Sequence, residues 1–253
     1  MPDSHQLRTT SIIARVSAFW RHVARTTPRL WNLLFIASAR DIDRYYDYYV
    51  DLARDAPLRA HCTGATTTLL FLLDCPLHAH HGLTSVKLAT LASLRRPWSY
   101  VHYMPYLEDL TINIVHPDFA PVTGEWSFYR ELSWEHPCTT LISLTIVAHD
   151  DEGMLDFMPV QTLLLQCSQS LERIDIDVGL AYTSHYREQM DFMPRLAVIE
   201  MRRSGCELLR CIEAPNVRAV SFSCPHTNFA GDLLSFSLKA STFPHLRRLE
   251  ISQ

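Results

Sequence analysis

The sequence has few glycines, no long apolar run and no excess of basic residues. Glycine accounts for only seven of the 253 residues, which suits helix-and-strand units better than glycine-rich turns. No apolar run is longer than the one at residues 69–73. That run is far below the roughly 20 residues that a membrane-spanning helix needs. The formal net charge of −4 gives no bias toward a phosphate backbone. We therefore expect neither a membrane span nor a nucleic-acid partner.

Cysteine usage and the N-terminal residues bear on the cellular compartment. The seven cysteines are odd in number and scattered along the chain, which is typical of reduced thiols rather than a disulfide framework. Arg8 and Arg15 interrupt the apolar residues near the N-terminus, so this segment does not read as a secretory signal. We expect a cytoplasmic or nuclear protein.

The common catalytic motifs are also missing. The sequence holds no glycine-rich phosphate loop, no glycine-x-serine-x-glycine turn and no histidine-glutamate-x-x-histidine helix. Serines, histidines and aspartates are numerous, but their spacing singles out no catalytic triad. We expect a protein that is not an enzyme and needs no cofactor.

What is present is a recurring pattern, leucine-x-x-leucine-x-isoleucine, in which other aliphatic residues, methionine or phenylalanine can substitute. Its seven copies begin at Leu83, Leu107, Leu141, Leu171, Leu196, Val217 and Leu246. Their starts are separated by 24, 34, 30, 25, 21 and 29 residues. In a strand, alternate side chains point to opposite faces, so the last two apolar positions of each copy point inward together. Such a unit buries its apolar face only between like neighbours. The pattern therefore predicts a stack of parallel strands.

The segments between copies are long enough for the crossover that parallel strands require. Helices or irregular connections are predicted at residues 66–73, 88–101, 155–167, 184–193, 206–212 and 229–238. Proline at positions 105, 194 and 244 is expected to end the preceding helix and start the extended chain.

The first 60 residues carry related signals. Helical spacing of apolar residues predicts one helix at residues 11–23, which Thr27-Pro28 should end, and another at 41–56. Residues 30–35 fit the repeat as an early, degenerate copy with Leu30, Leu33 and Phe35 at the apolar positions. A short strand is predicted at residues 58–62.

The N-terminal segment then suggests a family. Val16-Ser-Ala-Phe-Trp20-Arg-His-Val-Ala24, followed by Thr27-Pro28-Arg-Leu30-Trp31, resembles the second half of an F-box. Ala56-Pro57-Leu58 is similar to the start of the next short strand in such proteins. With the copies that follow, the chain resembles the F-box-like leucine-rich-repeat proteins of mushroom-forming fungi.

The resemblance implies an α/β leucine-rich-repeat solenoid. In this horseshoe the parallel sheet lines the concave side, and helices or irregular segments lie outside. A partial F-box-like helical segment would occupy residues 1–29 and the irregular repeat array residues 30–253. The usual asparagine or cysteine at the ninth repeat position is replaced, for example by His149 and Pro225, so irregular curvature is expected.

The family's role would make this chain the substrate-recognition subunit of an SCF-type ubiquitin ligase, a protein–protein interaction module. The leucine-proline-x-glutamate helix that opens an F-box is not found ahead of residue 11. That helix contributes to docking on the ligase adaptor. The alternative is therefore a stand-alone leucine-rich-repeat scaffold without ligase docking.

Two sets of residues are candidates for contact with protein partners. The resemblance assigns adaptor binding to Val16, Phe19, Trp20 and Trp31. The strand positions that point away from the core are the candidates for holding an unknown target protein on the concave face. They are Lys87, Asp109, Thr111, Asn113, Thr145, Arg173, Asp175, Asp177, Glu200, Arg202, Arg248 and Glu250. Their mixed charge fits a protein better than a nucleic acid, and the alternative is a merely solvated sheet face.

Two further clusters leave alternatives open. Cys75, His78, His80 and His81 could ligate zinc, but their spacing matches no paired-ligand pattern, so a polar loop is favoured and no metal site is predicted. The aromatic-rich insertion at residues 116–137 could form a binding lip, but we expect it to fold back and cover the array.

Overall fold

The computed structural model describes residues 17–36, 51–62, 83–90, 106–114, 140–148, 154–181, 191–203, 208–209, 211–223 and 243–252. The chain divides into two compact units. Unit 1 comprises Met1–Thr90 and Tyr103–Leu110, and unit 2 comprises Leu91–His102 and Thr111–Gln253. The predicted connections at 66–73 and 229–238, the cysteine–histidine cluster and the aromatic insertion all lie outside the described residues.

The first described element of unit 1 is helix α2 (Ala18–Thr26), which overlaps the helix predicted at residues 11–23 and extends three residues beyond it. Residues 11–16 of the predicted helix lie outside the described residues. The Ser17 hydroxyl caps this helix by accepting a hydrogen bond from the Trp20 amide at 3.2 Å. The helix ends at Thr26 with Thr27 as its C-cap, directly before Pro28 as predicted, and Pro28 begins the short 3-10 helix η1 (Pro28–Leu30). The indole Nε1 of Trp31 donates to the Ala24 carbonyl at 2.6 Å and ties the turn back onto the helix.

The repeat pattern forms strands. In unit 1 these are β1 (Leu33–Ile36), β2 (Leu58–Cys62) and β3 (Leu83–Thr90). Strand β4 (Asp109–Ile114) contains the boundary between the units. In unit 2 they are β5 (Ser143–Ala148), β7 (Arg173–Asp177), β10 (Val198–Arg202), β12 (Ala219–Ser223) and β13 (Arg248–Ser252).

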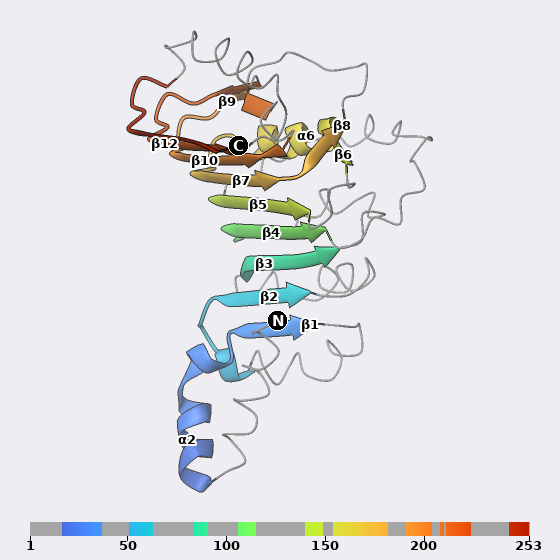
Figure 1. Cartoon of the computed structure of the whole chain (residues 1–253). Helices are drawn as coiled ribbons and strands as arrows, with labels where there is room; N and C mark the ends of the chain where they lie inside the picture. Colours follow the sequence, from blue (N-terminus) through green and yellow to red (C-terminus); the bar gives the residue numbers. More distant parts are fainter. Residues whose placement is uncertain are drawn as a thin grey trace. The chain divides into compact units, whose positions relative to one another are not determined.

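Within the described residues these nine strands form one sheet in chain order, β1-β2-β3-β4-β5-β7-β10-β12-β13. The register of six of its pairings is known, and each of the six is parallel. Figure 1 shows the strands of unit 2 lying one beside the next. The predicted stack of consecutive parallel strands is confirmed.

The core of the sheet consists of the pattern residues. In the copies that begin at Leu107, Leu141, Leu171, Leu196 and Val217, all three pattern positions are buried. In β7, for example, Ile174 and Ile176 are both 0 % exposed. The parallel register places each aliphatic side chain beside its equivalent on the next strand. Burial of these rows is the main favourable term in the stability of the fold.

The earliest copy is displaced by one residue from its predicted position. Trp31, Leu34 and Ile36 are the buried residues, whereas Leu30 is 43 % exposed. The prediction that Leu30, Leu33 and Phe35 occupy the apolar positions is therefore wrong. A shift of one residue turns every side chain of a strand to the other face, and the bulkier Trp31 takes the buried position.

Strand β2 contains a compressed copy of the pattern. Leu58 lies opposite Leu83, but the register shifts directly after it, so that Ala60 faces Val86 and Cys62 faces Leu88. Leu58 is fully buried and takes the place of the first leucine of the pattern. One residue fewer separates it from the next buried position, Ala60. Because positions 60 and 62 carry the small side chains of alanine and cysteine, this copy does not match the leucine-rich pattern in the sequence.

Turns with proline in second place lead into three strands of unit 2. The amides of Leu196, Val217 and Leu246 donate to the carbonyls three residues earlier, at Met193, Ala214 and Phe243. Pro194, Pro215 and Pro244 fix the backbone angle that such a turn requires at its second position.

The connections only partly match the predictions. Helix α6 (Phe157–Cys167) confirms most of the helix predicted at 155–167, with strand β6 (Met154–Asp156) directly before it. Strand β6 pairs with β8 (Gly179–Ala181), and β9 (Asp191–Phe192) pairs with β11 (Ile212–Glu213). Pro194 thus follows a short strand, not a helix. In the predicted segment 206–212, residues 208, 209 and 211 are 3-10 helical and 212 is already in β11.

Candidate functional site

The side chains opposite the buried rows form what we call the outer face of unit 2. Because β5, β7, β10, β12 and β13 pair in continuous register, these side chains fall into three rows across the strands. The first row is Ser143, Arg173, Val198, Ala219 and Arg248. The second row is Thr145, Asp175, Glu200, Ser221 and Glu250. The third row is Val147, Asp177, Arg202, Ser223 and Ser252.

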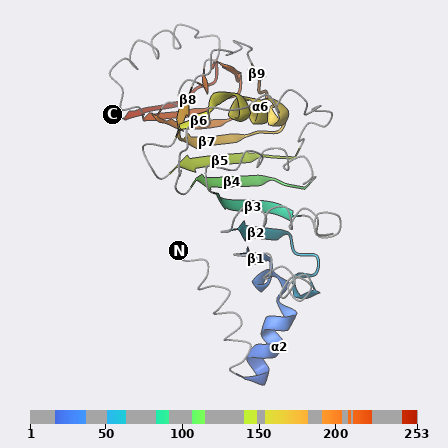
Figure 2. The same ribbon diagram turned by 90° about the vertical axis from the view of Figure 1, so that its right-hand side faces the viewer.

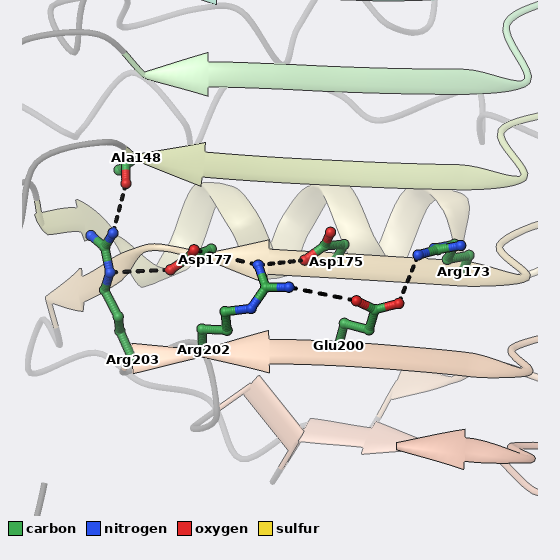
Figure 3. A network of polar contacts seen from close by, with 7 residues as sticks. All are labelled: Ala148, Arg173, Asp175, Asp177, Glu200, Arg202 and Arg203. Carbon is green, nitrogen blue, oxygen red and sulfur yellow. Dashed lines mark hydrogen bonds and ion pairs between the residues drawn. The ribbon is translucent and has the colours of Figure 1, made fainter. Parts of the chain in front are cut away.

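Arg202 is the centre of an ion-pair network on this face. Its guanidinium lies 3.4 Å from an Asp177 oxygen, 3.6 Å from Asp175 and 3.6 Å from Glu200. Figure 3 shows the guanidinium reaching along the sheet toward these carboxylates, with a helix passing behind the strands. Three carboxylates from two strands thus share one cation.

Two more arginines complete the network. Arg173, at the start of β7, donates a hydrogen bond to Glu200 of the neighbouring strand β10 at 2.7 Å. Arg203 lies just beyond the end of β10 with a positive φ of 55°. Its Nε is 3.1 Å from Asp177, and its Nη2 donates to the Ala148 carbonyl at 2.8 Å. This backbone conformation turns the Arg203 side chain back toward β5 and β7 (Figure 3).

Asp175 is the least solvated acid of the network, with 18 % of its side chain exposed. Burial raises the pKa of its carboxyl, the nearby Arg202 lowers that pKa in part, and Glu200 raises it again. Its Oδ1 has no hydrogen-bond partner among the described residues, because Arg202 stands slightly too far away. Asp175 and Asp177, with 18 % and 19 % of their side chains exposed, are therefore partly desolvated, whereas Arg248 and Glu250 on β13 are well exposed.

The other predicted target-binding residues also lie at strand positions that alternate with the pattern residues. Thr145 is half-buried beside Asp175, and the exposed Arg248 donates to the exposed Glu250 at 2.8 Å. Thr111 and Asn113, on the unit 2 part of β4, are half-buried, and Asp109 on its unit 1 part is exposed. Lys87 is half-buried in β3 of unit 1. The structure thus joins Arg173, Asp175, Asp177, Glu200 and Arg202 in one network.

The proposed adaptor-binding residues differ from one another in exposure. Phe19 is 67 % and Trp20 47 % exposed on α2, and their rings meet edge to face with centroids 5.4 Å apart. Trp31 is 1 % exposed, so any effect it has on a partner acts through the turn that it supports. Val16 lies outside the described residues. Phe19 and Trp20 together make an exposed aromatic pair on a short helix.

Two residues of interest, Arg203 and Asp191, are not indicated by the sequence pattern. Arg203 follows the strand and has no place in the alternating pattern. Asp191, in β9, is 3 % exposed, and neither carboxylate oxygen has a partner among the described residues. Burial raises the pKa of Asp191 to about 7. A lone aspartate before an aromatic residue carries no signal in the sequence that would have revealed its burial.

The described residues give no sign of a metal site or a membrane helix. No group of three or more histidine, cysteine or acidic residues in them could hold a metal ion. None of the helices described is long and apolar enough to span a bilayer. Cys62, Cys167 and Cys211 are buried, and burial raises the pKa of Cys62 to about 12. A thiol with so high a pKa is a poor nucleophile, and Cys62 packs as a small apolar group.

Comparison with protein-family models, with curated proteins and with solved structures finds no match to this chain.

Proposed function

We propose that the protein is a protein–protein interaction module that holds a target on the outer face of unit 2. The observation that carries this proposal is the network around Arg202, in which charges of both signs are fixed on neighbouring strands over a dry core. Fixed charges lose little side-chain entropy when a partner binds, so they favour specific recognition.

The charge balance of this face favours a protein partner. The three rows carry three arginines and four carboxylates, and Arg203 at the end of β10 adds a fourth cation. A nucleic acid would require an excess of lysine and arginine to replace its counterions. A protein surface of mixed charge can pair with both signs.

The more specific form of the proposal is a substrate-recognition subunit of an SCF-type ubiquitin ligase. It is supported by the resemblance of residues 16–31 to the second half of an F-box and by the exposed pair Phe19 and Trp20 on α2. In this role the repeat array would curve into a horseshoe with the outer face on its concave side. Partner subunits would perform the catalysis.

The ligase role is tested by a pull-down with the purified adaptor subunit. We expect the chain to retain the adaptor, and Phe19→Ala with Trp20→Ala to lose most of it. Tyr106→Ala is the matched control, because Tyr106 is similarly exposed at 53 % but lies ahead of β4. If the wild-type chain fails to retain the adaptor, even with an F-box N-terminal helix added, the ligase role is excluded and the stand-alone scaffold stands.

Target binding on the outer face is tested by quantitative affinity capture from cell extract. Arg202→Glu should remove proteins that the wild type retains, since it places a fourth negative charge among three carboxylates. Arg195→Glu is the control, because Arg195 pairs with Glu172 at 2.6 Å but lies in the turn before β10. Equal capture by the wild type and both variants would contradict recognition at this face.

A further inference from the structure

The last strand in the sheet order, β13, has an unusual combination of an open backbone edge and exposed aliphatic side chains. It pairs with β12 on one side, and none of the described strands pairs with its other side. Leu249 and Ile251 are 52 % and 57 % exposed, whereas their register partners on β12, Val220 and Phe222, are 2 % and 1 % exposed. The apolar rows of the core thus end on β13 in side chains that are exposed to solvent.

Natural sheets usually block such an edge with a proline, a bulge or an inward-pointing charge. Strand β13 has none of these between Arg248 and Ser252, and it pairs with β12 without a register shift. Its charged residues, Arg248 and Glu250, both lie on the outer face and contact each other. The edge is therefore competent to accept another strand.

We propose that β13 pairs antiparallel with β13 of a second copy of this chain, related by a two-fold axis at Glu250. In this register Leu249 lies opposite Ile251 of the second copy, and Ile251 lies opposite its Leu249. Both aliphatic residues of both copies are then covered on the same face of one continuous sheet. Two-fold related dimers are the commonest symmetric assembly.

The self-complementary register is restricted by the strand's own pattern. An antiparallel slip of one residue would place an aliphatic side chain opposite Arg248 or Glu250, and a slip of two would leave one aliphatic pair uncovered. On the outer face the two Glu250 side chains lie opposite each other at the axis, where their repulsion opposes pairing unless neighbouring cations offset it. Each is within diagonal reach of Arg248 of the other copy, in addition to the Arg248 of its own strand.

A head-to-tail arrangement, in which β13 pairs with β1 of another copy, would bury less apolar surface. At the other end of the sheet order, Leu34 and Ile36 of β1 are only 6 % and 4 % exposed, so β1 presents no matching apolar row to the β13 of another copy. Self-pairing of β13 therefore predicts a closed dimer and not an open filament.

The test is the molar mass in solution, measured by sedimentation velocity from a few micromolar to about 100 µM, where an interface of modest size associates. We expect the mass to rise from 29.1 kDa toward twice that value. Leu249→Lys with Ile251→Lys should hold the chain at the monomer mass. Leu165→Lys, at an exposed position of α6, should leave association unchanged. Circular dichroism confirms that each variant is folded.

A second measurement tests the register independently. Glu250→Cys places two thiols across the axis at a separation that a disulfide can span, and oxidation should give a covalent dimer. Ser252→Cys, two residues from the axis, should form far less covalent dimer under the same conditions. A monomer mass throughout the range, growth beyond a dimer, or equal cross-linking by the two variants would overturn the proposal.

Discussion

At the scale of single residues, the most consequential feature is the buried carboxyl of Asp191, whose burial could not be predicted from the sequence. Asp191 is 3 % exposed in β9, opposite Ile212 of β11, while its neighbours Phe192 and Glu213 face outward. Burial without a compensating hydrogen bond favours the neutral carboxyl, so the pKa of Asp191 lies at about 7, well above its ordinary value of 3.8.

This raised pKa predicts a loss of stability as the pH rises. Below the unfolded-state pKa the carboxyl is neutral in both states and contributes no pH dependence to the stability. Between about pH 4 and 7 the unfolded chain ionises while the folded chain stays protonated, so the free energy of unfolding falls by at most about 1.4 kcal/mol per pH unit. Above about pH 7 the loss levels off.

Urea unfolding of the wild type and of Asp191→Asn at several pH values between 4 and 8 isolates this contribution. The difference between the two proteins should move in favour of the variant as the pH rises. A difference that is independent of pH would mean that Asp191 titrates normally in the folded protein.

Arg202 provides the second prediction at this scale. Replacing it with glutamine leaves Asp175, Asp177 and Glu200 with less cationic charge, and the pKa of Asp175 should rise further, because Arg202 lowers it. Arg202 is 43 % exposed, so solvent screens the effect, and we expect a loss of about 1 kcal/mol at pH 7 that shrinks toward pH 4. Arg195→Gln removes a more exposed pair and should cost less than about 0.5 kcal/mol at either pH.

At the scale of elements, the two-residue period of the strands was the reliable signal. It identified the strands β3, β4, β5, β7, β10, β12 and β13. In β4, β5, β7, β10 and β12 the alternate apolar residues are buried in a shared core, whereas in β13 they are exposed. This signal failed for the first copy because tryptophan replaces leucine in the buried position and adjacent leucines offer two frames. It missed the short strands β6, β8, β9 and β11, which are too short to show a period.

The corrected frame of the first copy makes a direct prediction. Trp31→Ala removes a fully buried side chain and its hydrogen bond to Ala24, and should lower the free energy of unfolding by about 3–5 kcal/mol. Leu30→Ala, one residue earlier and 43 % exposed, should cost under about 1 kcal/mol. Urea denaturation of both variants distinguishes the frames, and a larger loss for Leu30→Ala would restore the original one.

The candidate site was predictable in outline but not in detail. Alternation placed Arg173, Asp175, Asp177, Glu200 and Arg202 on one face, because each flanks buried residues of its strand. Their contacts depend on the register between β7 and β10, which aligns Asp175 with Glu200 and Asp177 with Arg202. Separations along the chain of 25 or 27 residues do not specify that register, nor the backbone turn that brings in Arg203.

At the scale of the whole molecule, the repeats act together, because each strand covers the apolar row of its neighbour. The described strands follow one another in chain order, and each parallel pairing repeats the same contact between equivalent residues. The proposed recognition face is a consequence of this arrangement. If the strands did not run parallel and in register, the charges around Arg202 would not meet.

The most direct test of this arrangement is disulfide trapping between β10 and β12. Parallel pairing aligns Arg202 with Ser223, whereas Val198 lies four residues away from that partner along the strand. The variant with cysteines at both 202 and 223 should form an intramolecular disulfide on mild oxidation, and the variant with cysteines at 198 and 223 should not. Ready cross-linking of the 198/223 pair with none at 202/223 would show strands that run in opposite directions, and would contradict the account.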